Sequence, residues 1–194
     1  MVQENKANLS LLCYGPDMDP KFFSKYALKN YDLVTVQNYR RFFGFLGLVD
    51  HDLEDLFDER RNLKFKNVGE ASIEISPANS FNAVLYYGVS SDMVRTLDAI
   101  NSNSHRQRVF ISRDKVNLYG ASVSRLKTAD QITAYQGRSR IFYNGENLSL
   151  LSCEFIAHPE YLLRCRTAAL VHGEKFLRDF NRTSYTANRK NTFS

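Results

Sequence analysis

The stretch Asn8-Leu-Ser-Leu-Leu-Cys-Tyr-Gly-Pro-Asp-Met18 carries the clearest structural signal in the chain. It begins as an apolar run and stops abruptly at Tyr14-Gly-Pro-Asp17, which is typical of a buried strand that feeds a tight loop. Gly15 permits a positive φ, whereas Pro16 fixes φ and removes a backbone donor. Such a loop can aim backbone N–H groups at a small anion. An ordinary turn between a strand and a helix is the alternative interpretation.

Composition favours one globular domain over residues 1–194, with short polar tails at about 1–7 and 183–194. The chain has 194 residues, 43% of them hydrophobic, which is enough for one sizeable core. The net charge of +5 is modest, and the sequence contains no Lys/Arg tract and no zinc-finger spacing. Nucleic acid is therefore not the expected partner. No run approaches the roughly 20 apolar residues that a membrane helix needs, so no membrane association is expected.

The cysteines indicate a reducing compartment. Cys13, Cys153 and Cys165 are widely spaced and lie in apolar segments, which suits reduced core thiols in a cytoplasmic protein. No Cys-x-x-Cys pair occurs and the four histidines lack metal-ligand spacing, so neither a metal site nor a cofactor is expected. The polar segment Met1–Lys6 does not look like a signal peptide.

Hydrophobic periodicity predicts an α+β chain. Helices are expected over about 20–29, 93–100, 159–171 and 174–180, the second of them capped near Ser90. Strands are expected over 9–13, 32–45, 69–75, 83–89, 106–112 and 138–143. Residues 77–82 are predicted to form a turn. Residues 46–66 and 113–137 look like insertions, and the second allows an extra hairpin of undetermined register.

Three motifs in the first half of the chain resemble the γ-glutamylcyclotransferase-like family. Tyr14-Gly-Pro-Asp-Met18 resembles the Tyr-Gly-Ser-Asn-Met/Leu loop that opens this family. Gly69-Glu-Ala-Ser-Ile-Glu-Ile-Ser-Pro77 resembles its Gly-x-Ala-x-Ile strand that ends in Pro. Val84-Leu-Tyr-Tyr-Gly-Val89 resembles its central Val-x-Gly-x-x-Tyr strand.

Three later motifs follow in the same order. Met93-Val-Arg-Thr-Leu-Asp98 resembles the family's short helix that ends in Leu-Asp, and Arg138-Ser-Arg-Ile-Phe-Tyr143 resembles its late strand that ends in Tyr. His158-Pro-Glu-Tyr-Leu162 resembles the Ser-Pro-Glu-Tyr-Leu start of its last helix. Each motif is weak alone, but their shared order over about residues 9–180 identifies the family.

The resemblance implies a small, strongly curved mixed β-barrel with a few flanking helices. It also implies an enzyme that cyclises a γ-glutamyl group to pyroglutamate and releases an amine. In such an enzyme the Tyr-Gly loop holds the substrate carboxylate through backbone N–H groups. A Glu four residues after the Leu of Leu-Asp then serves as general acid and base, taking a proton from the attacking amine and giving one to the leaving amine. The implied ligand-binding residues of this chain are Tyr14, Gly15, Pro16, Asp17, Met18 and Tyr143.

The chain departs from the family pattern at the catalytic position. Counting four residues from Leu97 gives Asn101, which has no titratable proton and so cannot act as a base. Glu70, on a predicted strand, and His105, after the Asn-rich turn, are candidate substitutes. Two hypotheses stand: an enzyme of the cyclotransferase class, or a catalytically silent relative that binds a small γ-glutamyl-like metabolite, a peptide end or a protein partner in the same pocket.

Overall fold

The computed structural model describes residues 9–26, 28–45, 68–120, 126, 131–138, 140–143, 146–149, 156–157 and 159–185. The predicted excursion at 46–66 and the predicted tail at 1–7 lie outside these residues. The strands are β1 (Leu9–Cys13), β2 (Tyr31–Phe45), β3 (Val68–Val89), β4 (Arg106–Ile111), β5 (Val116–Leu118), β6 (Gln131–Gly137), β7 (Arg140–Tyr143), β8 (Glu146–Ser149), β9 (Ile156–Ala157) and β10 (Ser184–Tyr185). The helices are η1 (Pro16–Met18), η2 (Pro20–Tyr26), α2 (Ser91–Asn103), η3 (Arg113–Lys115), α3 (Pro159–Leu170) and α4 (Glu174–Thr183).

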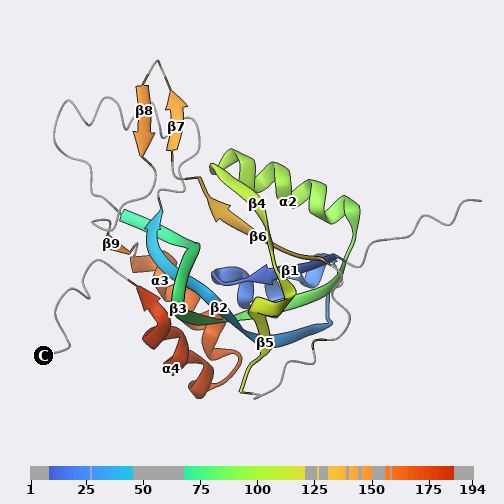
Figure 1. Ribbon diagram of the computed structural model, residues 1–194. Helices are drawn as coiled ribbons and strands as arrows, with labels where there is room; N and C mark the ends of the chain where they lie inside the picture. The colour runs from blue at the N-terminus through green and yellow to red at the C-terminus, as the bar shows by residue number, and fades with distance from the viewer. Residues whose placement is uncertain are drawn as a thin grey trace, which may run out of the picture.

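The α+β prediction is confirmed by one strongly bent mixed sheet with helices on both sides (Figure 1). The strand order is β10-β2-β3-β1-β6-β4, with β5 added to β2 and β9 added to β3. Helices α3 and α4 lie on one side, at the lower left of the view, and α2 lies on the other. The described apolar side chains meet in one hydrophobic core. No helix in the described part of the chain has the length and apolar character needed to cross a membrane.

The two longest strands form a bent hairpin in which the predicted turn at 77–82 is not a turn. β3 runs unbroken through these residues and pairs with β2 from Tyr31↔Tyr86 to Phe45↔Glu70. The register shifts between Gln37 and Tyr39, where both Asn38 and the facing Ala78 have positive φ. The turn residues therefore form a bulge that bends the ribbon and leaves the pairing on either side intact.

The sheet curves like a barrel but does not close, so the expected barrel is an open one. The first half of β3 approaches β6 and β4 through side-chain contacts instead of a backbone ladder. The Arg106 guanidinium donates to the Ala71 carbonyl at 2.9 Å, and Gln136 donates to the Ile73 carbonyl at 2.8 Å. The Gly137 amide donates to Ser72 Oγ at 3.1 Å. These bonds join the open edges beside the site described below.

The late strand of the sheet is β6, not the predicted strand at 138–143. β6 pairs in parallel with β1 and antiparallel with β4, so the supposed insertion at 113–137 contains a central strand. β7 instead pairs with β8 in a separate hairpin, seen at the top left of Figure 1. The physical reason is burial, because Ile132 and Ala134 are buried against the core. Gly137 also packs so closely on Phe45 that a Cβ atom there would overlap the ring.

The helices follow the sequence more closely. The Ser90 hydroxyl accepts a hydrogen bond of 3.2 Å from the Met93 amide, so the predicted cap of α2 is confirmed. α3 and α4 occupy the two predicted C-terminal helical segments. The segment predicted as a helix over about 20–29 is the tighter 3₁₀-helix η2, which ends at Tyr26. Its Phe23 ring packs edge-on against Tyr86 of β3 at 5.0 Å, so tertiary packing holds this short element.

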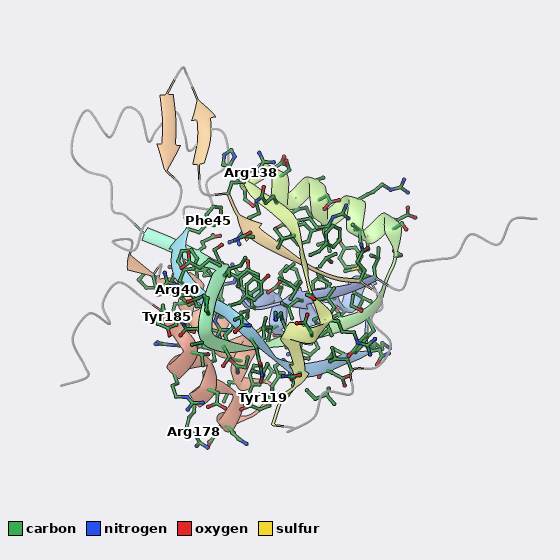
Figure 2. The ribbon with its side chains drawn as sticks, in the orientation of Figure 1. Arg40, Phe45, Tyr119, Arg138, Arg178 and Tyr185 are labelled. Carbon is green, nitrogen blue, oxygen red and sulfur yellow. The ribbon has the colours of Figure 1, made fainter. Side chains whose placement is uncertain are left out.

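The C-terminal end of α4 is tied to the sheet by β10, so the predicted polar tail begins later than residue 183. Ser184 and Tyr185 pair with Arg41 and Phe42 of β2. The Tyr185 ring lies over the Arg40 guanidinium at 5.5 Å, and Figure 2 shows the two side chains together at the sheet edge. Residues 186–194 lie outside the described part of the chain.

The buried side of the same junction is organised by Arg41, which has no exposed surface. Its guanidinium donates to the Asn82 carbonyl at 2.9 Å, to the Phe180 carbonyl at 3.2 Å and to Ser184 Oγ at 3.1 Å. The Phe180 ring stacks on it at 3.8 Å. These acceptors are neutral oxygen atoms, and burial lowers the pKa of Arg41 to about 9. Arg41 therefore remains a cation at neutral pH and joins α4 to the centre of the sheet.

Candidate functional site

A cavity of about 370 Å³ opens beside the loop that follows β1. Its walls come from β1, both 3₁₀-helices at the N-terminal end, α2, β3, β4, β6 and α3. The aromatic lining residues are Tyr14, Phe22, Phe23, Tyr26, Tyr135 and Tyr161. The charged and amide lining residues are Asp17, Glu70, Asn101, Arg106 and Arg164. A cavity with a mainly aromatic and aliphatic wall and a few convergent polar groups is typical of a small-molecule site.

The structure brings most of the predicted site residues to this one cavity. Tyr14, Gly15, Pro16, Asp17, Glu70 and Asn101 all line it. Met18 and His105 are not among the lining residues. Met18 is fully buried, and its carbonyl contacts His172 Nε2 at 2.8 Å. Tyr143 belongs to the β7–β8 hairpin by its backbone, and its side chain lies outside the described residues.

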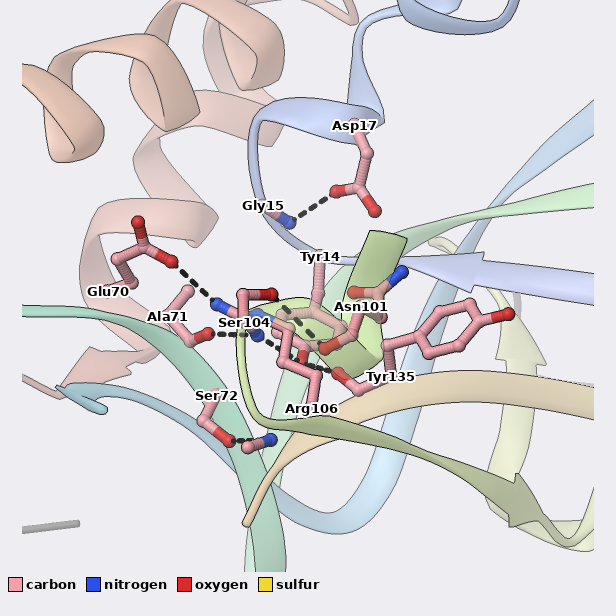
Figure 3. Close-up of polar contacts among 11 residues, drawn as sticks. Tyr14, Gly15, Asp17, Glu70, Ala71, Ser72, Asn101, Ser104, Arg106 and Tyr135 are labelled. Carbon is pink, nitrogen blue, oxygen red and sulfur yellow. Dashed lines mark hydrogen bonds and ion pairs between the residues drawn. The ribbon is translucent and has the colours of Figure 1, made fainter. Parts of the chain in front are cut away.

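The loop after β1 uses its own backbone donors. The Gly15 amide donates to Asp17 Oδ1 at 2.9 Å (Figure 3), and Pro16 has no N–H. The Met18 amide donates to the Gly15 carbonyl and the Asp19 amide to the Pro16 carbonyl, each at 3.2 Å. This loop therefore already holds a carboxylate of its own chain where the family resemblance implies a substrate carboxylate.

Gly15 is required by close approach, because its φ of −116° is open to any residue. A Cβ atom at this position would lie 2.9 Å from the Tyr161 hydroxyl and 3.3 Å from Asp17 Oδ1. The loop, its own carboxylate and the α3 tyrosine are thus packed in direct contact. A larger residue at this position would require the Tyr161 side chain to shift.

The Asp17 carboxyl is the acidic group of the cavity whose pKa is shifted. Burial raises the pKa of Asp17 above its usual value, and the Gly15 amide, the Cys13 thiol and the Arg106 cation offset this only in part. A carboxyl group whose pKa is raised inside a cavity is a candidate proton donor or acceptor.

The Arg106 guanidinium crosses the floor of the cavity and is neutralised by Glu70. The two side chains form an ion pair of 3.0 Å, drawn in Figure 3, with the Arg106 side chain 10% exposed and that of Glu70 34% exposed. The centroid of the Phe45 ring lies 4.7 Å from the guanidinium carbon of Arg106. Arg106 is therefore held in place by two contacts, the ion pair with Glu70 of β3 and the ring of Phe45 of β2.

A chain of polar contacts fixes α2 against the sheet. The Tyr14 hydroxyl donates to the Tyr135 carbonyl, and the Tyr135 hydroxyl donates to Asp98 Oδ1 at 2.9 Å. Asp98 Oδ2 also pairs with the Arg108 guanidinium at 3.4 Å. Burial, together with the Asp98 carboxylate, raises the pKa of Tyr135 above its usual value, so this phenol stays protonated at neutral pH. Asp98 of the Leu-Asp pair thus connects α2 to β6 and β4.

Asn101 lies in the last turn of α2 and lines the cavity. Its side-chain nitrogen donates to the Leu97 carbonyl at 2.8 Å. The amide offers hydrogen bonds but no exchangeable charge, so it can position a ligand and cannot take its proton.

Sequence reasoning missed Arg106, Tyr135 and Tyr161 as lining residues. Tyr161 stood in the quoted His158–Leu162 motif, so a signal for it was present. Tyr135 was hidden because the register of 113–137 was undetermined. Arg106 is recognised only through its pairing with Glu70, which lies 36 positions earlier in the chain. Among the residues described, no three His, Cys, Asp or Glu side chains are grouped as metal ligands.

The bent sheet, the loop after β1 and the flanking helices together define the fold of the γ-glutamyl cyclotransferases. A solved structure described as a γ-glutamyl cyclotransferase matches with a TM-score of 0.54 and 13% identity, over 96% of this chain and 94% of that one. An uncharacterised human protein matches with a TM-score of 0.55 and 12% identity, over 97% and 93% of the two chains.

A yeast γ-glutamyl cyclotransferase specific to glutathione also matches, with a TM-score of 0.50 and 14% identity, over 95% of this chain and 100% of that one. No protein-family model matches the sequence, and no curated protein matches it. At these identities the likeness establishes the fold, and function has to be argued from the site.

Proposed function

We propose that the cavity binds a small metabolite with a primary amine and an amide carbonyl, as in a γ-glutamyl amide, and that the protein does not cyclise it efficiently. The observation that carries the proposal is Asn101. It lines the cavity, at the position to which the family resemblance assigns the general acid and base. Its side-chain nitrogen donates a hydrogen bond to the Leu97 carbonyl.

The chemistry explains why this residue matters. In cyclisation a bond forms between the α-nitrogen and the γ-carbonyl carbon, and the bond from that carbon to the leaving amine breaks. The α-nitrogen must lose a proton, and the leaving nitrogen must gain one. An amide does neither, so Asn101 lowers the rate by about 10²–10⁴-fold relative to a carboxylate in the same place.

The test measures binding and pyroglutamate release separately. Isothermal titration of the full chain with N-methyl γ-glutamyl amide reports binding. Asn101→Glu is expected to release pyroglutamate faster than the wild type. Fast release by the wild type overturns the proposal, as does the absence of binding both of this amide and of its counterpart without the α-carboxylate. A protein partner at the same cavity would appear as a competitor of the small ligand.

Cyclisation with a displaced base is the second candidate function, and Asp17 favours it. Its carboxyl lines the cavity and has a raised pKa. Glu70 also lines the cavity but is paired with Arg106. If the wild type is fast, loss of activity in Asp17→Asn, Glu70→Gln or His105→Ala, with the fold intact, identifies the substitute base.

The two free thiols described, Cys13 and Cys165, are buried and support a reducing compartment such as the cytoplasm.

A further inference from the structure

The cavity contains two groups that would ordinarily bind an anion, and each is occupied by a carboxylate of the chain itself. The Gly15 amide donates to Asp17 at 2.9 Å, and the Arg106 guanidinium pairs with Glu70 at 3.0 Å. The Met18 and Asp19 amides are bonded to carbonyls within the loop, and Pro16 offers no amide hydrogen. An incoming carboxylate therefore meets a carboxylate of the chain at each of these two groups.

We propose that the cavity selects a primary-ammonium ligand that lacks an adjacent carboxylate, with Asp17 and Glu70 as the residues that set this selectivity. This inference rests on the proposed binding function and names its ligand class. An ω-amino amide fits, because its ammonium can be placed against Asp17 and Glu70 while its amide meets Asn101. Tyrosine and phenylalanine side chains also line the cavity, and aromatic rings attract cations.

The burial of the charged side chains decides whether a ligand carboxylate is attracted or repelled in the cavity. Asp17 and Glu70 are partly withdrawn from water, so charges act on each other strongly there. The largely buried Arg106 cation is already paired with Glu70, which leaves Asp17 as the carboxylate without a cationic partner at ion-pair distance among the described contacts. Arg164 also lines the cavity, but its side chain is exposed. An ion pair between a ligand carboxylate and an exposed arginine is screened and contributes little. The attraction between Arg164 and a ligand α-carboxylate is therefore too weak to offset the repulsion of that carboxylate by Asp17 and Glu70.

The experiment compares two ligands that differ by one carboxylate. N-methyl-4-aminobutanamide and N-methyl γ-glutamyl amide are titrated into the full chain at neutral pH. We expect the first to bind at least about tenfold more tightly, which corresponds to about 1.4 kcal/mol. Asp17→Asn should shrink this ratio about tenfold, because Asn keeps an acceptor for the Gly15 amide and removes the charge.

Asp19→Asn is the matched control. Asp19 lies in the same loop but does not line the cavity, and its Oδ1 accepts a bond from the Lys21 amide that Asn can also accept. The ratio of the affinities for the two ligands should be the same in Asp19→Asn as in the wild type. If Asp17→Asn does not fold, Glu70→Gln serves as the second variant with the same expected direction.

The outcomes separate this inference from the proposed function. If the γ-glutamyl amide binds as tightly as its counterpart or more tightly, the selectivity is wrong while binding stands. An unchanged ratio in a folded Asp17→Asn variant also overturns the inference. If neither ligand binds, both the inference and the proposed function are wrong.

Discussion

Asp17 Oδ1 accepts a hydrogen bond of 2.9 Å from the amide of Gly15, two residues earlier in the same loop. This bond places a negative group at the end of β1, where a cyclotransferase-like loop is implied to receive one from its substrate. Burial raises the pKa of Asp17, so folding opposes its ionisation. The ionised Asp17 carboxylate in the cavity therefore lowers the free energy of unfolding.

Asp17→Asn should gain stability relative to the wild type as the pH rises. The folded-state pKa of Asp17 lies above its unfolded value, so its contribution to stability is present at low pH and is lost as the pH rises through the folded pKa. Asn does not titrate. Urea unfolding between about pH 4 and about pH 7 should show a growing difference in favour of the variant. A difference that is flat or shrinks with pH would contradict the assignment, and Asp19→Asn provides the control.

Gly15→Ala should weaken ligand binding by about tenfold or more and lower stability by about 1–3 kcal/mol, because the new Cβ meets the Tyr161 hydroxyl. Gly88→Ala is a matched control. Gly88 has a φ of +71° and no atom within 4 Å of the place that a Cβ would take, so this change should cost about 1–2 kcal/mol without changing affinity. Titration and thermal unfolding of both variants check this. Equal affinities in the two variants would show that the loop does not shape the ligand site.

Arg41→Met should lower the free energy of unfolding by about 3 kcal/mol, because it leaves the Asn82 and Phe180 carbonyls without their buried donor. Arg40→Met changes the neighbouring residue, whose side chain is 38% exposed and pairs with Glu74 at the surface. Its cost should stay below about 1 kcal/mol. Urea denaturation measures both. Similar costs for the two variants would mean that Arg41 does not anchor α4.

Local signals in the sequence were sufficient for the loop after β1, the cap of α2 and the two C-terminal helices. Ser90 and the break at Gly15-Pro16 act within a few residues, so short patterns reveal them. The common cavity of Asn101 and the loop was an expectation from the family resemblance and not from local patterns.

Long-range pairing was beyond local patterns. No local sequence pattern near β6 predicts that it pairs in parallel with β1. The aromatic run that ends at Tyr143 had the stronger strand pattern in the sequence. The same limit applies to the side chains. The charge of Asp17 was visible in the sequence, but its bond to Gly15 and the pairing of Glu70 with Arg106 depend on how the bent sheet folds over.

Pyroglutamate release tests the central claim, that the cavity binds without efficient cyclisation, most directly. The assay compares the wild type with Asn101→Glu, alone and combined with Pro16→Ser and Asp17→Asn, all at saturating N-methyl γ-glutamyl amide. The combined variant regains a carboxylate on α2 and a loop amide, and it loses the loop charge. We expect its kcat to exceed that of the wild type by about 10²-fold or more. A wild-type rate equal to or above that of the combined variant would contradict the account.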